Sequence, residues 1–119
     1  MLTPLELDIM KAVWRNRPIT VRDVQESIRP ERKLAYTTVM TIMDRLYHKG
    51  FLSRTLQSRT HYYEPAIDYT DVRDEAVELL IRNFFGSKEK LQEFLQGEPP
   101  PLPPKMVTEP ISTLDETLL

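Results

Sequence analysis

The residues best suited to chemistry on a partner molecule lie in the stretch Leu34–Leu52, LAYTTVMTIMDRLYHKGFL. Thr37, Thr38 and Thr41 share one side of a helix there, and Arg45 follows on the same side. Their hydroxyl, methyl and guanidinium groups can hydrogen-bond to base edges and pack on thymine methyls in a DNA major groove. β-Branched residues lose rotamer freedom in helices, so three exposed threonines contribute little to stability. This conflict between propensity and position indicates a DNA-reading helix.

The opposite side of the same helix is apolar. Val39, Ile42, Met43 and Leu46 recur at steps of three and four residues, which places them on one buried face. Gly50 is suited to end the helix as a left-handed residue after its C-cap. The residues of this helix and its end that we expect to contact DNA are Thr37, Thr38, Met40, Thr41, Arg45, His48 and Lys49.

Two helices are expected ahead of the threonine-rich one. Thr3, Pro4 and Glu6 combine a capping box with a proline at the first helical position. Thr20 caps a second, shorter helix, which Pro30 closes. The buried stripe of the first helix consists of Ile9, Met10, Val13 and Trp14. A short helix, a brief connector and a helix with an exposed polar face match the helix-turn-helix arrangement.

A β-hairpin is predicted after Gly50. Phe51–Leu56 and Thr60–Glu64 are rich in β-branched and aromatic residues, and the polar connection Gln57–Arg59 is short. We expect Arg54 and Arg59 to lie near the tip of this hairpin. Three helices followed by a hairpin predict a mainly α fold of the winged helix-turn-helix type.

The charge of the chain is unevenly distributed. Met1–Pro65 carries 11 Lys and Arg against 7 Asp and Glu, whereas Ala66–Leu119 carries 5 against 11. A local positive surface is what a phosphate backbone requires, although a merely solvated surface is the alternative. The chain has no cysteine, which excludes disulfides and thiolate metal sites and fits a cytoplasmic protein. No apolar run approaches the roughly 18 residues that span a membrane, so no membrane insertion is expected.

Catalysis finds little support in the composition. His48 and His61 are the two histidines, and no glycine-rich phosphate loop is present. Paired carboxylates such as Asp74 and Glu78 fall on a solvated helix side. We therefore expect a protein that is not an enzyme and that needs neither a cofactor nor a metal. The remaining rival is a winged helix that binds another protein instead of DNA.

The pattern changes after residue 67. We expect a DNA-binding domain over residues 1–67, a helical dimerisation segment over 68–97, and a proline-rich, disordered tail over 98–119. A broad apolar stripe beyond a complete small domain calls for a partner, and a second copy of the chain is the simplest one. The alternative is that these helices fold back on their own domain. The predicted dimer interface consists of Val72, Val77, Leu80, Ile81, Phe84, Phe85, Leu91, Phe94 and Leu95.

Four segments resemble the BlaI/MecI family of winged-helix repressors, the penicillinase repressors. They are LTPLELDIMKAVW, ITVRDVQESI, LAYTTVMTIMDRLYHKGFL and SRTHYYEPAI. The resemblance implies a homodimeric repressor that occupies dyad-symmetric operators in double-stranded DNA, with the third helix reading the major groove. It also implies that the wing residues Arg54, Ser58 and Arg59 touch the backbone or the minor groove. Some members carry basic residues where this chain has Thr37 and Met40, so an exact operator sequence does not transfer.

The resemblance further implies a way in which repression is lifted. In antibiotic-sensing members, a membrane sensor-protease signal leads to cleavage at an Asn-Phe bond in the dimerisation segment. Asn83-Phe84 sits at a similar position here. The alternative is that Asn83 is an ordinary surface residue and Phe84 an interface residue. The cysteine cluster of the related copper-responsive repressors has no counterpart in this chain.

Overall fold

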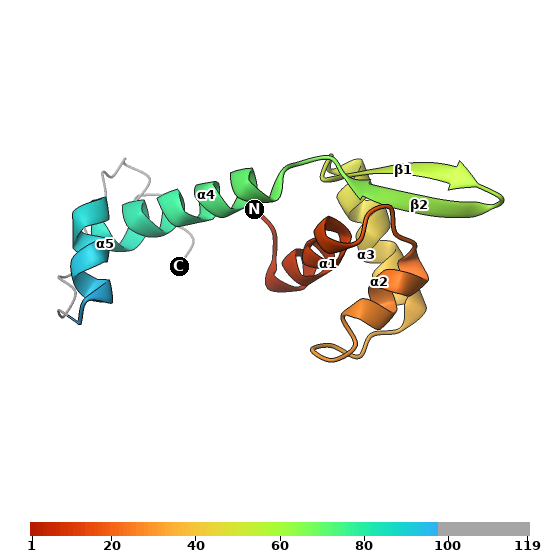
Figure 1. Ribbon diagram of the computed structural model, residues 1–119, viewed down its shortest axis with the longest axis horizontal. Helices are drawn as coiled ribbons and strands as arrows, with labels where there is room; N and C mark the ends of the chain where they lie inside the picture. Colours follow the sequence, from red (N-terminus) through yellow and green to blue (C-terminus); the bar gives the residue numbers. More distant parts are fainter. Residues whose placement is uncertain (98–119) are drawn as a thin grey trace, which may run out of the picture. The chain divides into compact units, whose positions relative to one another are not determined.

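The computed structural model describes residues 1–97, so the tail expected over 98–119 lies outside the described residues. The chain divides into two units, Met1–Val72 and a second unit that begins at Arg73 (Figure 1). Each unit is described by itself below.

Helix α1, Pro4–Arg15, begins with the capping box that the sequence predicts. The Glu6 amide donates to Thr3 Oγ1 at 3.1 Å, and the Thr3 amide donates to Glu6 Oε1 at 3.0 Å. Because the capping box satisfies two of the orphan amides of the first turn, the start of α1 is well defined.

Helix α2, Val21–Ser27, is capped by Thr20, whose Oγ1 accepts from the Asp23 amide at 3.2 Å. The connector that follows is held at two points. The Gln25 side-chain amide donates to the Leu34 carbonyl at 3.0 Å, and Arg32 pairs with Asp8 of α1 at 2.7 Å. These contacts fix the path of the chain into the third helix.

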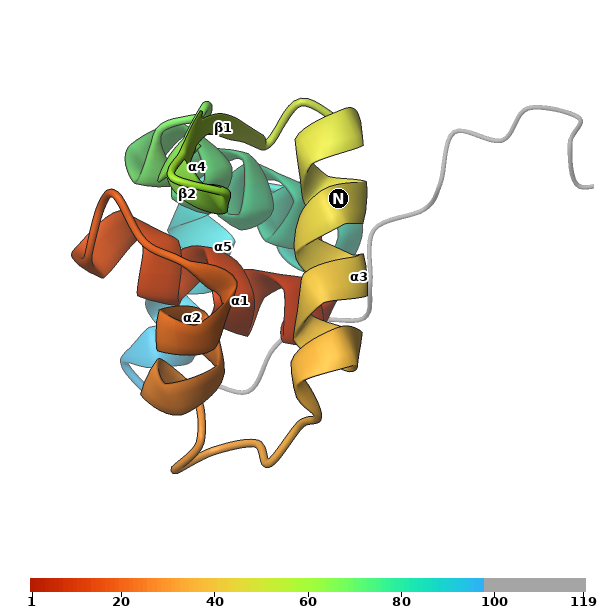
Figure 2. The same ribbon diagram turned by 90° about the vertical axis from the view of Figure 1, so that its right-hand side faces the viewer.

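Helix α3, Tyr36–His48, ends in a Schellman motif. Gly50, at φ +89°, donates its amide to the Tyr47 carbonyl, and the Phe51 amide donates to the Leu46 carbonyl at 2.9 Å. This confirms the predicted left-handed glycine. Within the first unit, Figure 2 shows α1, α2 and the hairpin all on one side of α3.

Strands β1, Leu52–Gln57, and β2, Thr60–Pro65, form the wing as an antiparallel hairpin. Its two-residue turn places Ser58 at φ +49° and Arg59 at φ +69°, the left-handed pair that a tight hairpin turn requires. The expectation that Arg54 lies near the tip is wrong. The register runs from Leu52↔Pro65 at the base to Gln57↔Thr60 at the tip, and Arg54 pairs with Tyr63 near the base.

The base of the wing is also joined to the segment before α2. Ile19 and Tyr63 exchange two backbone hydrogen bonds, of 3.0 and 2.8 Å, and so form an isolated antiparallel bridge. The wing therefore leaves the domain from an anchored base.

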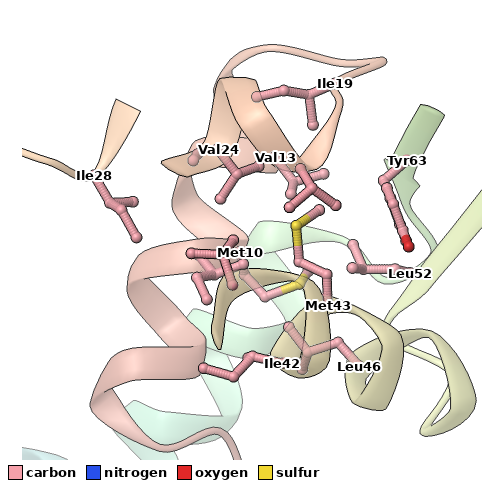
Figure 3. Close-up of a cluster of buried hydrophobic side chains, with 14 residues drawn as sticks. Met10, Val13, Ile19, Val24, Ile28, Ile42, Met43, Leu46, Leu52 and Tyr63 are labelled. Carbon is pink, nitrogen blue, oxygen red and sulfur yellow. The ribbon is translucent and has the colours of Figure 1, made fainter. Parts of the chain in front are cut away.

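The core of the first unit draws on α1, α2, α3 and the base of the wing (Figure 3). Each of the larger side chains contributes roughly 1.5–3 kcal/mol through burial. Trp14 is only partly buried: its indole N–H donates to the Ile67 carbonyl at 3.0 Å, and Tyr69 meets its ring edge-on. The buried hydrophobic residues are Ile9, Met10, Ala12, Val13, Ile19, Val21, Val24, Ile28, Val39, Ile42, Met43, Leu46, Leu52 and Tyr63.

After the wing, the chain forms α4, Tyr69–Leu80, a π-helical turn η1, Ile81–Phe85, and α5, Lys88–Leu95. Gly86 and Ser87 separate η1 from α5: Gly86 adopts φ +83°, and the Ser87 hydroxyl accepts from the Lys90 amide. The widened turn was not expected. It closes with the Gly86 amide donating to the Ile81 carbonyl at 2.7 Å, a bond that spans five residues.

Candidate nucleic-acid interface

The outer side of α3 carries the residues that the sequence singles out for base contact. Thr37, Thr38, Thr41 and Arg45 are exposed. We call these four residues the reading face. With Ile42 they line a shallow hollow of about 400 Å³ on the surface of the helix. The apolar residues predicted for the inner side are all buried, which holds the reading face outward.

The chemistry of the reading face suits base edges. Threonine hydroxyls donate and accept, their methyl groups offer small apolar contacts, and the planar guanidinium of Arg45 can form two parallel hydrogen bonds. Small side chains also let the helix approach a groove floor closely. The arrangement therefore combines hydrogen bonding, methyl contact and one fixed positive charge on a single helical face.

A second hollow, of about 340 Å³, lies between α3, the wing and the start of α2. Arg22 and Arg59 bring positive charge to it from two elements, while Tyr36 and Met40 present exposed apolar surface of α3. The sequence interpretation included Met40 and Arg59 but missed Arg22 and Tyr36. The Thr20 cap shows only where α2 begins, whereas the Ile19–Tyr63 bridge brings the wing near Arg22, and the sequence does not reveal that contact. The lining residues are Thr20, Val21, Arg22, Tyr36, Met40, Arg59, Thr60, His61 and Tyr63.

The tip of the wing is open to solvent. Ser58 and Arg59 are both exposed, and Leu56 on the neighbouring strand is 61% exposed. A cation on a projecting turn can reach a phosphate backbone without distorting the domain. The positions of Ser58 and Arg59 are therefore compatible with the predicted DNA contact.

Arg54 has a different environment from the other candidate residues. Its Nη1 lies 2.9 Å from Asp44 Oδ1 and 3.5 Å from the Tyr63 hydroxyl, and its guanidinium carbon lies 4.0 Å above the Tyr47 ring. The hydrogen bonds with Tyr63 and then Asp44 raise the pKa of the guanidinium above its usual value. Its side chain is 23% exposed, so it is a partly enclosed residue of the wing base.

His48 and Lys49, the last two candidate residues of α3, also have partners within the domain. His48 Nε2 lies 3.6 Å from Asp44 Oδ1, and Lys49 Nζ lies 3.3 Å from Oε2 of the buried Glu6. The Thr3 amide, and after it Lys49, hold the pKa of the Glu6 carboxyl below its usual value, although burial acts against them. Lys49 therefore ties the end of α3 to the start of α1.

The predicted dimer residues lie on α4, η1 and α5, none of which contains a buried residue. Val72, Ile81, Phe85 and Leu91 are partly covered, and the Phe85 and Phe94 rings lie 5.4 Å apart. Asn83 is exposed within η1. The residues of the stripe that remain open to solvent are Val77, Leu80, Phe84, Phe94 and Leu95.

Among residues 1–97, no three His, Cys, Asp or Glu side chains gather as a metal-binding group. None of the helices described there is long and apolar enough to cross a membrane.

Three helices, a wing and an exposed polar third helix define a protein of the winged helix-turn-helix class. The DNA-binding domain of the repressor BlaI has this architecture, at 28% identity and a TM-score of 0.54 over 60% of this chain and 87% of that one. The family model described as penicillinase repressor matches residues 2–115. The chain belongs to the penicillinase repressor family.

Individual relatives match between about half and three quarters of the chain. The transcriptional regulator BlaI of Mycobacterium tuberculosis is 43% identical over 65 residues, which are 54% of this chain and 47% of that protein. The penicillinase repressor of Bacillus licheniformis is 25% identical over 85 residues, or 71% of this chain and 66% of its own length. The chain thus spans about half the length of the mycobacterial relative. A solution structure of B. licheniformis BlaI with the blaP half-operator matches 60% of this chain and 87% of that chain, at 28% identity and a TM-score of 0.52.

Proposed function

We propose that this protein is a transcriptional repressor that binds dyad-symmetric operators in double-stranded DNA as a homodimer, through α3 and the wing. The observation that carries the proposal is the reading face: three threonines and Arg45, exposed on a helix whose other side is anchored in the core. Relatives of the chain are named as regulators or repressors, and one similar structure was solved with a half-operator. A repressor of chromosomal genes works in the cytoplasm, which is where we place the protein.

The homodimer follows from the apolar stripe on α4, η1 and α5. Leu80 and Phe84 are 41% and 57% exposed, and a second copy of the stripe can cover both. Two copies of α3 would then meet half-sites separated by about 34–36 Å, one turn of DNA, or by a multiple of it. A dimer lying on a promoter excludes polymerase by its bulk.

The expected salt dependence is steep. If each protomer places three to five donors on phosphates, the dimer makes roughly six to ten such contacts. Affinity should then fall by about 10³–10⁵-fold between 50 and 200 mM salt. Sequence discrimination should depend less on salt, because it comes from the reading face.

The test is to select DNA with the purified chain from a random-sequence duplex library and then compare Thr41→Ala with the wild type. Loss of one good base contact should cost about 1–3 kcal/mol of discrimination per half-site and leave non-specific binding nearly unchanged. Thr70→Ala is the matched control, because the Thr70 hydroxyl bonds Asp68 and lies outside the reading face. Unchanged discrimination in Thr41→Ala would show that α3 is not the reader.

The same selection separates the DNA-binding reading from the protein-binding one. A winged helix that binds another protein would enrich no sequence above the starting library. A dyad-symmetric sequence enriched by the wild type supports the repressor. Mapping such sites on the genome would then identify the regulated genes.

We also propose that proteolysis at Asn83-Phe84 relieves repression in response to a membrane sensor-protease system. Asn83 is exposed, and it lies in the widened η1 turn that precedes the Gly86 break. Mass spectrometry of the protein from cells treated with a β-lactam should reveal a fragment that ends at Asn83. Only intact protein in treated, derepressed cells would contradict this mode of relief.

A further inference from the structure

A cluster of four side chains joins the wing to α3. Asp44 and Tyr47 come from α3, Arg54 from β1, and Tyr63 from β2. We call these residues the wing-base cluster. Arg54 lies at its centre, with the Asp44 carboxylate, the Tyr63 hydroxyl and the Tyr47 ring all within 4.0 Å of its guanidinium group.

The wing-base cluster marks the point beyond which the wing is exposed. Tyr63 is only 2% exposed and is held by the backbone bridge to Ile19. From residue 55 to residue 61, in contrast, every residue is exposed. Arg54↔Tyr63 is therefore the last strand pair with a buried member before the tip that carries Arg59.

We propose that the Asp44–Arg54 pair sets the orientation of the wing relative to α3, so that Arg54 is a positioning residue for DNA binding and not a phosphate contact. The proposal rests on the proposed function and deepens it. Arg54 links two elements that must meet one DNA molecule together. Its Nη1 donates to Asp44 and to Tyr63, and its guanidinium lies over the Tyr47 ring, so contacts from three directions hold it in place. Its charge is matched by Asp44, which leaves Arg45 and Arg59 to meet DNA.

If Arg54 positions the wing, Asp44→Asn should weaken DNA binding; if Arg54 contacts DNA directly, Asp44→Asn should strengthen it. Asp44 is a half-exposed carboxylate on the recognition helix, so simple electrostatics predicts that Asp44→Asn strengthens binding to the negatively charged DNA. If Asp44 instead holds Arg54, Asp44→Asn must weaken binding although a negative charge has been removed. His48 also faces Asp44, with Nε2 3.6 Å from Oδ1, so the comparison is repeated in a His48→Gln background.

The experiment measures the affinity of four chains for the duplex that the wild type selects: wild type, Asp44→Asn, Arg54→Gln and the double variant. We expect each single variant to bind about tenfold more weakly, and the double variant to lose no more than either alone, because both remove one shared interaction. Glu64→Gln, at an exposed carboxylate of β2, is the matched control and should bind at least as tightly as the wild type. Arg59→Gln should weaken binding additively with Asp44→Asn.

A second measurement needs no DNA. Amide hydrogen exchange across residues 55–61 should become faster in Asp44→Asn and Arg54→Gln, while α1 and α2 stay protected. Tighter binding by Asp44→Asn, or additive losses in the double variant, would show that Arg54 touches DNA directly. If the variants had lower thermal stability but unchanged DNA affinity and unchanged hydrogen exchange, the wing-base cluster would stabilise the fold without orienting the wing. If the wild type selects no duplex, the proposed function fails, and the exchange data alone decide whether the pair holds the wing.

Discussion

The first unit, Met1–Val72, buries fourteen hydrophobic side chains, whereas α4, η1 and α5 bury none. Both regions have amphipathic helices, and each contains a helix capped by a threonine or serine hydroxyl. The difference is that α1, α2, α3 and the wing cover one another, while the stripe of the later helices remains open. The first region therefore has the core needed to fold by itself, and the second requires something to cover it.

Because of this contrast, residues of the same type have different roles in the two regions. Leu46 is fully buried and stabilises a domain, while Leu80 is 41% exposed and available to a partner. A leucine at a helical apolar position thus has one of two roles, depending on whether its own chain covers it. Three experiments test the contrast, beginning with the largest expected effect.

The largest effect is expected from Leu80→Asp. In a two-fold dimer the substitution occurs twice, and each copy loses roughly 1.5–3 kcal/mol of apolar burial and places a carboxylate in an apolar contact. Sedimentation analysis should show monomers, and affinity for a two-site operator should fall by a hundredfold or more. Glu78→Lys, on the polar side of α4, is the control. If Leu80→Asp still formed an unaltered dimer, the apolar stripe would not be the dimer interface.

The next effect compares two leucines within the first unit. Leu46→Ala should lower the free energy of unfolding by about 2–5 kcal/mol, because it leaves a cavity in a fully covered core. Leu56→Ala, on the open wing, should change it by no more than about 0.5 kcal/mol. Urea denaturation followed by Trp14 fluorescence measures both. If both substitutions lowered the free energy of unfolding equally, Leu56 on the wing would be buried in solution.

The smallest effect concerns the buried Glu6 carboxylate. Glu6→Gln keeps a hydrogen-bond acceptor for the Thr3 amide but removes the charge that pairs with Lys49, at a cost of about 1–2 kcal/mol. Because folding lowers the pKa of Glu6, its stabilisation is present above the usual value of 4.5 and is lost as the pH falls through the lower, folded value. The difference between wild type and variant should therefore be full at pH 6–7 and shrink below about pH 4.5. A difference independent of pH would exclude the ion pair as its source.

The sequence was most informative where a local pattern decides the outcome. Thr3 with Glu6, Thr20 with Asp23, and Gly50 all act within one helical turn of their positions, and the structure confirms each of them. The four apolar positions of α3 follow from helical period alone and are all buried.

The expectations that failed depend on contacts between distant segments. Arg54 looked like a wing-tip arginine because the sequence shows neither the strand register nor Asp44, ten residues earlier, as its partner. The pairing of Lys49 with Glu6 was not predicted for the same reason, since Glu6 lies forty-three residues away along the chain; the DNA contact expected of Lys49 stays a prediction. The π turn at Ile81–Phe85 differs from an α turn by one extra residue, a change that apolar spacing does not reveal.

The turn at Ser58 and Arg59 has a practical consequence for anyone who engineers this protein. Both residues adopt left-handed backbone angles, which cost an ordinary L-residue roughly 1–2 kcal/mol and cost glycine almost nothing. Asn-Gly is the pair that such a turn favours, so a screen for heat resistance would select it. The same exchange would remove the cation from the end of the wing. If Arg59 meets DNA as proposed, a more heat-resistant variant obtained in this way would bind DNA more weakly, and only a screen that scores both properties would detect the loss.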